Sequence, residues 1–150
     1  MKLYLLTAFL LCALQCLEAQ HSKKMKNDIQ DSTAIANSLE DFYFRGIYEG
    51  SLDLLGRIFN PGTLLFGDVK GQPYAKTLEQ YLNGVKNRQS PKDSGKPFKG
   101  EIISIKLVNS IAIAEVKVKM YDFNYDEFLS FHKLDGRWLI VNKMISDTNE

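Results

Sequence analysis

The sequence predicts an α+β fold in which helices come first and an antiparallel sheet follows. Apolar residues recur at three- and four-residue steps after Asp31, which is the period of an amphipathic helix. After Gly100 the chain consists of segments typical of strands, separated by two short turn signals, Asn109-Ser110 and Asp135-Gly136. Helices followed by such a meander are typical of a sheet with helices packed on one face.

Residues 1–19 have the three parts of a secretory signal peptide. A charged Lys2 precedes an apolar stretch from Leu3 to Leu14, and a polar segment follows. The stretch is shorter than the roughly 20 apolar residues that a membrane-spanning helix needs. We therefore expect cleavage after Ala19 and export of the mature protein, either to the periplasm or out of the cell.

Both cysteines of the chain, Cys12 and Cys16, lie within this predicted signal. The mature domain would then have no thiol, no disulfide and no cysteine-based metal site. Lipidation of Cys16 is the alternative to release, and it would anchor the domain to a membrane. Otherwise we expect no membrane association after cleavage.

The charge of the chain is nearly balanced, with 19 basic and 18 acidic residues and a formal net charge of +1. Domains that bind nucleic acid usually carry a concentrated basic surface. The composition therefore predicts no nucleic-acid partner.

Residues 20–30 are polar and predict a flexible leader, which leaves 31–147 as the folded domain. Within that domain, the first helix would begin at Asp31, whose side chain can cap it, and end at Gly50. Ser51 can cap a second, short helix.

One strand is expected between the second and third helices. Asn60-Pro61-Gly62 ends the second helix, residues 63–69 predict the strand, and Lys70-Gly71 predicts a turn. Thr77 and Gln80 have the spacing of a capping box, which would start the third helix.

The two hairpin turns set the expected register of the sheet. The first turn would place Ile103 opposite Val116 on an apolar, core-facing side. The second turn would place Leu129 opposite Asn142.

Several helix ends, turns and core positions carry a family resemblance. They are Tyr43, Gly46-Ile47-Tyr48-Glu49-Gly50-Ser51, Ile58-Phe59-Asn60-Pro61 and Leu134-Asp135-Gly136-Arg137-Trp138-Leu139-Ile140-Val141-Asn142-Lys143. These segments resemble the nuclear transport factor 2-like superfamily, and within it the branch called putative lumazine-binding or SnoaL-like proteins. The resemblance covers nearly the whole of residues 31–146.

What the resemblance implies is a cone-shaped fold. Three N-terminal helices would pack on a strongly curved antiparallel sheet, and a pocket would open at the wide end. The same fold serves ketosteroid isomerases, polyketide cyclases, dehydratases and transport factors. The resemblance therefore predicts the architecture and leaves the activity open.

We expect the ligand on the concave wall of the last hairpin. The face with Phe131, Trp138 and Asn142 combines aromatic rings with one amide, which suits a small apolar or aromatic molecule. Tyr43 would add its hydroxyl from the first helix. A further cluster combines acidic and aromatic side chains, and it predicts either a solvated strand connection or the rim of a pocket. Its members are Tyr121, Asp122, Phe123, Tyr125, Asp126 and Glu127.

Asp68 and His132 are the candidates for a catalytic base. Acid–base enzymes of the superfamily place an aspartate or histidine on the pocket wall. Asp68 is alternatively an ordinary residue that leads into the turn at Lys70-Gly71, with no role in catalysis. His132 is the only histidine of the predicted domain and has no metal-ligand spacing around it. We expect no metal site and no cofactor.

The preferred function is that of an exported, non-catalytic domain that binds a small molecule. One alternative is a SnoaL-type enzyme that transfers a proton on a carbonyl compound, with Asp68 or His132 as the base. The other is a protein-interaction or homodimerisation module that uses the outer face of the sheet.

Overall fold

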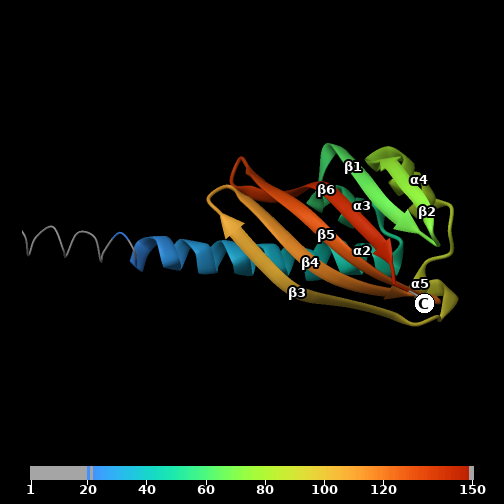
Figure 1. Cartoon of the computed structure of the whole chain (residues 1–150). Helices are drawn as coiled ribbons and strands as arrows, with labels where there is room; N and C mark the ends of the chain where they lie inside the picture. Colours follow the sequence, from blue (N-terminus) through green and yellow to red (C-terminus); the bar gives the residue numbers. More distant parts are fainter. Residues whose placement is uncertain (1–19, 21, 149–150) are drawn as a thin grey trace, which may run out of the picture.

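A computed structural model of the protein describes residue 20 and residues 22–148. The predicted signal peptide lies outside these described residues. A six-stranded sheet of order β2-β1-β6-β5-β4-β3 forms one layer. Helices cover one of its faces, and the sheet curves around them (Figure 1). The predicted α+β class, with helices packed on a curved sheet, is thereby confirmed.

The predicted strands are present together with one more, β2, but β1 begins at Phe59 and includes Asn60-Pro61-Gly62, which were predicted to precede it. Their bounds are β1 (Phe59–Val69), β2 (Gln72–Thr77), β3 (Phe98–Val108), β4 (Ile111–Met120), β5 (Phe123–Leu134) and β6 (Arg137–Asp147). Neighbouring strands are antiparallel except β1 and β6, which are parallel. The last strand thus lies between β1 and β5 and joins the N-terminal and C-terminal parts of the sheet.

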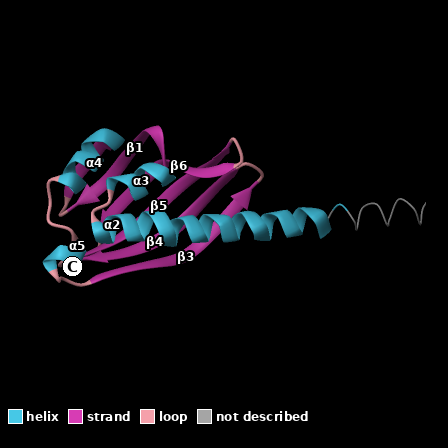
Figure 2. Cartoon of the chain, turned by 180° about the vertical axis from the view of Figure 1, so that it is seen from behind, coloured by secondary structure: helices cyan, strands magenta, loops and turns pink. Residues whose placement is uncertain are grey.

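The first helix is longer than the sequence predicts. Residues 22–38 are helical, and the helix continues through a π-helical segment, η1 (Leu39–Phe44), into α2 (Arg45–Glu49). Residues 22–30, predicted as a flexible leader, extend this helix beyond the sheet (Figure 2). The segment 22–38 contains neither glycine nor proline, so nothing in it ends a helix.

Asp31 accordingly lies inside the helix and does not cap it. Its Oδ1 atom accepts hydrogen bonds from Lys133 Nζ at 2.6 Å and from Trp138 Nε1 at 3.1 Å. Both donors belong to the β5–β6 hairpin. These bonds fix the long helix to the end of the sheet.

Three shorter helices follow, α3 (Leu52–Ile58), α4 (Leu78–Lys86) and α5 (Pro91–Ser94). The predicted caps are confirmed: Ser51 Oγ accepts from Leu54 N, and Thr77 and Gln80 form a complete capping box. Gly46 of α2 allows α3 to approach closely, because a Cβ there would lie 2.9 Å from Leu55 Cγ.

Two β-bulges change the expected register. In β3 the extra residue is Ile103, so Ile102 pairs with Val116 and the Ile103 side chain is exposed. The predicted pairing of Ile103 with Val116 is wrong for this reason. A bulge inserts one residue into one strand and reverses the faces of those that follow.

The second bulge lies in β6, where Val141 is the extra residue. Ser130 therefore pairs with Asn142, and Leu129 pairs with Lys143. The predicted pairing of Leu129 with Asn142 is wrong. Lys143 faces the interior and is only 3% exposed. Asn142 instead donates from Nδ2 to Leu64 O at 3.0 Å.

Candidate functional site

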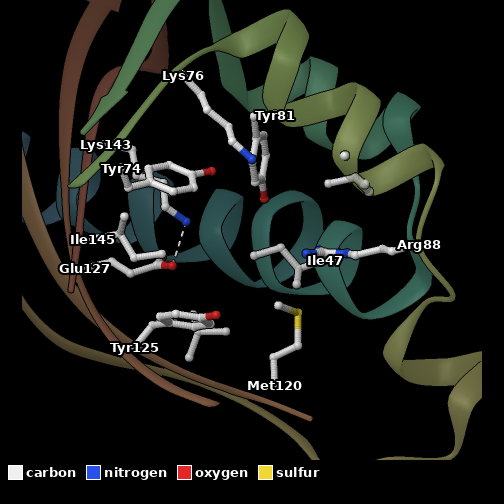
Figure 3. Close-up of a pocket in the computed structure, with 13 residues that line it drawn as sticks. Ile47, Tyr74, Lys76, Tyr81, Arg88, Met120, Tyr125, Glu127, Lys143 and Ile145 are labelled. Carbon is white, nitrogen blue, oxygen red and sulfur yellow. Dashed lines mark hydrogen bonds and ion pairs between the residues drawn. The ribbon is translucent and has the colours of Figure 1, made fainter. Parts of the chain in front are cut away.

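A cavity of about 210 Å³ lies between α4 and the concave face of the sheet (Figure 3). Its wall combines tyrosines, charged groups and aliphatic side chains from α2, β2, α4, β4, β5, β6 and the loop after α4. The lining residues are Ile47, Tyr74, Lys76, Tyr81, Gly84, Val85, Arg88, Val118, Met120, Tyr125, Glu127, Lys143 and Ile145. Segments distant in sequence thus meet around one space.

A buried network of three polar side chains contains two that line the cavity, Glu127 and Lys143, and a third, Tyr43, that bonds to both. Tyr43 Oη donates to Glu127 Oε2 at 2.5 Å, and Lys143 Nζ donates to Glu127 Oε1 at 2.6 Å. Lys143 Nζ also donates to Tyr43 Oη at 2.6 Å. The exposed fractions are 0% for Tyr43, 1% for Glu127 and 3% for Lys143. Each buried charge is therefore paired and hydrogen-bonded, as burial of charge requires.

Three local features bring this network together. Tyr43 lies in the π-helical segment η1, and π-helical turns occur often at functional sites. Glu127 pairs in register with Ile145 of β6, so Lys143 is its diagonal neighbour on the same face. The bulge at Val141 is what turns Lys143 toward that face.

Burial shifts the proton affinities in this network. It raises the pKa of the Tyr43 hydroxyl, and the negative charge of Glu127 raises it further. Burial lowers the pKa of the Lys143 ammonium, although Glu127 acts in the opposite direction. Lys143 Nζ also lies 5.3 Å from the ring centroid of Tyr43 and 5.5 Å from that of Tyr81, distances typical of cation–π contacts.

The tyrosines of the wall keep their protons at neutral pH. Burial raises the pKa of Tyr74 and Tyr81, and it raises that of Tyr125 to about 12. Their hydroxyls can therefore donate hydrogen bonds to a ligand as well as accept them.

Arg88 enters the cavity from the side opposite to the Glu127–Lys143 pair (Figure 3). It lies in the loop that follows α4. Its Nε atom is buried and has no hydrogen-bond partner among the described residues. Such a buried donor without an acceptor is rare in folded proteins, since it costs free energy to desolvate.

Of the four residues predicted to bind a ligand, Tyr43 does not line the cavity itself but bonds to Glu127 and Lys143, which do. Phe131 is buried in the core, at 1% exposure. Trp138 contacts Asp31 at the other end of the sheet, and Asn142 contacts β1. None of these last three lines the cavity.

The two candidate bases also lie outside the cavity. Asp68 Oδ1 accepts from Gly71 N at 3.1 Å and so stabilises the β1–β2 turn. His132 pairs in register with Ile111 of β4. Neither Asp68 nor His132 lines the cavity.

The acidic and aromatic cluster divides between surface and cavity. Tyr125 and Glu127 line the cavity, as the pocket-rim interpretation requires. Asp122 forms an ion pair with Lys96 at 3.1 Å on the surface. Asp126 lies 3.6 Å from Lys117. Alternation along β5 separates Asp126 from Tyr125 and Glu127, because successive side chains point to opposite faces, and Asp122 lies in the turn before β5.

Lys143, Arg88, Tyr74 and Tyr81 were not identified from the sequence as site residues.

Within residues 22–148 no group of three or more histidine, cysteine, aspartate or glutamate side chains could hold a metal ion. None of the described helices is long and apolar enough to cross a membrane.

Comparison with solved structures reveals close likeness in fold. A nuclear transport factor 2-like (NTF2-like) protein of unknown function from Silicibacter pomeroyi has a TM-score of 0.72 at 20% identity, covering 80% of this chain and 98% of that one. An NTF2-like protein of unknown function from Shewanella baltica has a TM-score of 0.71 at 22% identity, covering 81% and 97%. One from Methylobacillus flagellatus has a TM-score of 0.71 at 21% identity, covering 81% and 94%.

Among curated proteins, none matches the sequence significantly. The profile of one family, described as "Putative lumazine-binding", matches residues 30–146. That range includes every residue that lines the cavity. The chain belongs to this family, within the NTF2-like superfamily.

Proposed function

We propose that this protein is a non-catalytic binding domain whose cavity takes up a small organic molecule. The observation that carries the proposal is the composition of the cavity wall: the buried Glu127–Lys143 pair, which Tyr43 holds from the helical layer, faces aromatic and aliphatic side chains. Ligand sites are commonly built from apolar walls with a few fixed polar groups. The volume of about 210 Å³ is below the roughly 300–1,000 Å³ typical of drug-sized ligands, which favours a molecule of one or two rings.

The geometry favours binding over proton transfer. A general base needs an oxygen or nitrogen within hydrogen-bond reach of the substrate. Both carboxylate oxygens of Glu127 already accept bonds from Tyr43 and Lys143. The bases considered for a SnoaL-type reaction, Asp68 and His132, lie elsewhere. The network therefore suits a fixed polar wall better than a reacting one.

The test is ligand binding with a blocked cavity. Gly84 of α4 lines the cavity, and a Cβ at this position would meet no heavy atom within 4 Å. Gly84→Phe should fold and obstruct the cavity. Gly56→Phe is the matched control, since Gly56 is also helical and open but lies outside the cavity.

Small molecules retained by the natively purified protein are identified by mass spectrometry. Lumazine, a bicyclic pteridine named by the family description, and single-ring aromatic compounds are then titrated by calorimetry. We expect a ligand that binds the wild type and Gly56→Phe but not Gly84→Phe. Equal binding to all three proteins would overturn the proposal, as would the absence of any retained or titrated ligand.

We also propose that residues 1–19 direct export and are removed. The support is Lys2, the apolar stretch after it and the polar segment that follows. N-terminal sequencing of the protein from the producing cell should begin at or near Gln20. A chain that keeps Met1 and stays in the cytoplasm would contradict export.

A second candidate function is contact with another copy of this chain through the outer face of the sheet, the face away from the helices. Phe66, Met144 and Phe128 are neighbours in register on β1, β6 and β5, and they are 44%, 53% and 44% exposed. Adjacent exposed apolar side chains are typical of contact surfaces. Sedimentation equilibrium should show a dimer that Met144→Asp dissociates. A monomer at all concentrations would exclude this function.

A further inference from the structure

We infer that the cavity selects a small organic anion and that Arg88 binds its carboxylate. This inference rests on the proposed function, because it concerns the ligand of the same cavity. It goes further in naming the charge of the ligand and the residue that recognises it.

The first argument is the charge balance of the wall. Among the described residues that line the cavity, three carry a positive charge, Lys76, Arg88 and Lys143, and one carries a negative charge, Glu127. Lys143 and Glu127 neutralise each other across 2.6 Å. Arg88 and Lys76 remain. An empty cavity with this excess attracts anions and repels cations.

The second argument is the state of the Arg88 side chain. Its Nε atom is buried without an acceptor, while the Glu127 carboxylate lies across the cavity and is occupied by Tyr43 and Lys143. The guanidinium is planar and carries five donors that match two carboxylate oxygens. The Nε atom itself is enclosed by the protein, so a ligand carboxylate would accept from the end of the guanidinium, which points into the cavity (Figure 3).

The third argument is the reach of the Arg88 charge over the wall. Burial raises the pKa of Tyr74, Tyr81 and Tyr125, and the charge of Arg88 opposes that rise; for Lys143, burial lowers the pKa and Arg88 adds to the lowering. The charge of Arg88 therefore acts on several side chains around the space where a ligand would lie. Lys76, on the exposed side, adds a second positive charge with its Nζ 4.9 Å from the Tyr74 ring centroid.

The remaining wall determines what the anion carries. Tyr74, Tyr81 and Tyr125 offer rings and protonated hydroxyls, and a group of aliphatic side chains and a methionine completes the wall. The members of that group are Ile47, Val85, Val118, Met120 and Ile145. An acid with an apolar or aromatic body fits such a wall better than an inorganic ion, which would leave the apolar surface uncovered.

The experiment compares acids with neutral amides of the same shape. The probes are 4-hydroxybenzoate with 4-hydroxybenzamide, and hexanoate with hexanamide, titrated by calorimetry at pH 7. We expect at least one acid to bind about tenfold more tightly than its amide, because a hydrogen bond between two charged groups is stronger than one to a neutral amide. This comparison needs only the wild-type protein.

Variants then test the role of Arg88. Arg88→Gln should remove most of the acid-over-amide preference and leave amide affinity within about twofold, because only the charged partner is lost. Arg88→Lys should retain part of the acid-over-amide preference. Lys86→Gln is the control: Lys86 is an exposed cation on α4 that does not line the cavity, so its loss should leave both affinities unchanged.

Two results would overturn the selection of an anion. One is equal affinity for each acid and its amide, and the other is no binding of either acid. If the amides or lumazine still bind and Gly84→Phe abolishes that binding, the cavity binds ligands without charge selection, and the proposed function stands. If Arg88→Gln keeps the full preference, another cation recognises the anion and Arg88 is wrongly assigned.

Discussion

Glu127 and Lys143 form an ion pair that is almost completely buried, with 2.6 Å between Oε1 and Nζ, from diagonal positions on the adjacent strands β5 and β6. Tyr43 closes the network from the helical layer by bonding to both. The two layers of the fold are therefore connected by polar contacts at the cavity wall, in addition to the apolar core. This arrangement leads to predictions about stability as well as binding.

Loss of one partner of the pair should be costly. Lys143→Met leaves the Glu127 carboxylate buried without its cation, and we expect a loss of about 3–5 kcal/mol in the free energy of unfolding. The double variant Lys143→Met/Glu127→Gln should lose less than Lys143→Met alone, because the amide still accepts from Tyr43 and carries no charge. Urea unfolding followed by circular dichroism measures both. If the losses in unfolding free energy of Lys143→Met and of Glu127→Gln add up to the loss of the double variant, the pair is not coupled.

Stability should fall in alkaline solution. Burial raises the pKa of Tyr43 and Tyr81 above the usual 10.0, so the unfolded chain loses these protons first and stability declines as the pH rises beyond that value. Lys143 acts in the opposite sense up to about its usual 10.5, because its pKa is lowered in the fold. Above 10.5 only the tyrosine effect remains, and the free energy of unfolding should decrease.

The matched variants for this pH effect are Tyr81→Phe and Tyr48→Phe. Tyr81 is 8% exposed and Tyr48 is 39% exposed. Thermal unfolding from pH 9 to pH 12 should show a shallower decline for Tyr81→Phe than for the wild type. An identical decline in both variants would mean that Tyr81 does not contribute.

The parallel pairing of β1 with β6 can be tested at Gly67. A Cβ at this position would lie 1.7 Å from Ile145 O, and the residue has φ +151°, so Gly67→Ala cannot be accommodated without separating the strands. Gly62→Ala is the control, with φ +86° and open space around it. We expect the control to cost about 1–2 kcal/mol for its left-handed backbone and Gly67→Ala to cost clearly more. Equal melting temperatures would contradict the parallel pairing.

The attachment of the long helix depends on Asp31. The hydrogen bond from Lys133 lowers the pKa of Asp31 below its usual 3.8, so its contribution is present above that pH and is lost as the pH falls through the lowered value. Asp31→Ala should cost about 1 kcal/mol at pH 7, since the contact is partly exposed. Unfolding is followed by the fluorescence of Trp138, the only tryptophan. Asp28→Ala, on the exposed part of the same helix, should be within about 0.5 kcal/mol of neutral.

Much of the fold could be predicted because its signals are local. Ser51, Thr77 and Gln80 cap helices through bonds that span three residues, and the turn at Asp135-Gly136 sets the first pairs of its hairpin. The bulges at Ile103 and Val141 have no such local signal. Each is decided by how the strand packs against neighbours distant in sequence, and each reverses the faces of the residues that follow.

The site was therefore only partly predictable. Tyr43 could be placed on a buried stripe by its helical period, and Glu127 belonged to an acidic and aromatic cluster. Lys143 could not be placed, since a lysine in a strand usually faces solvent and only the bulge turns it inward. Arg88 could not be placed either, because a loop residue after a helix enters a cavity only once the sheet has curved beneath it.

The insertion of β6 between β1 and β5 has a consequence for how the protein acquires its structure. Antiparallel hairpins such as β3–β4 can form from adjacent segments as soon as both have been synthesised. The β1–β6 contact joins residues 59–68 to residues 140–146 and depends on the last part of the domain. Contacts between distant segments form slowly because the intervening chain must first be ordered. Completion of the cavity, including the arrival of Lys143 beside Glu127, is thus a late event in folding. A chain shortened before Lys143 would lack the second half of β6 and the two residues that it contributes to the cavity wall, Lys143 and Ile145.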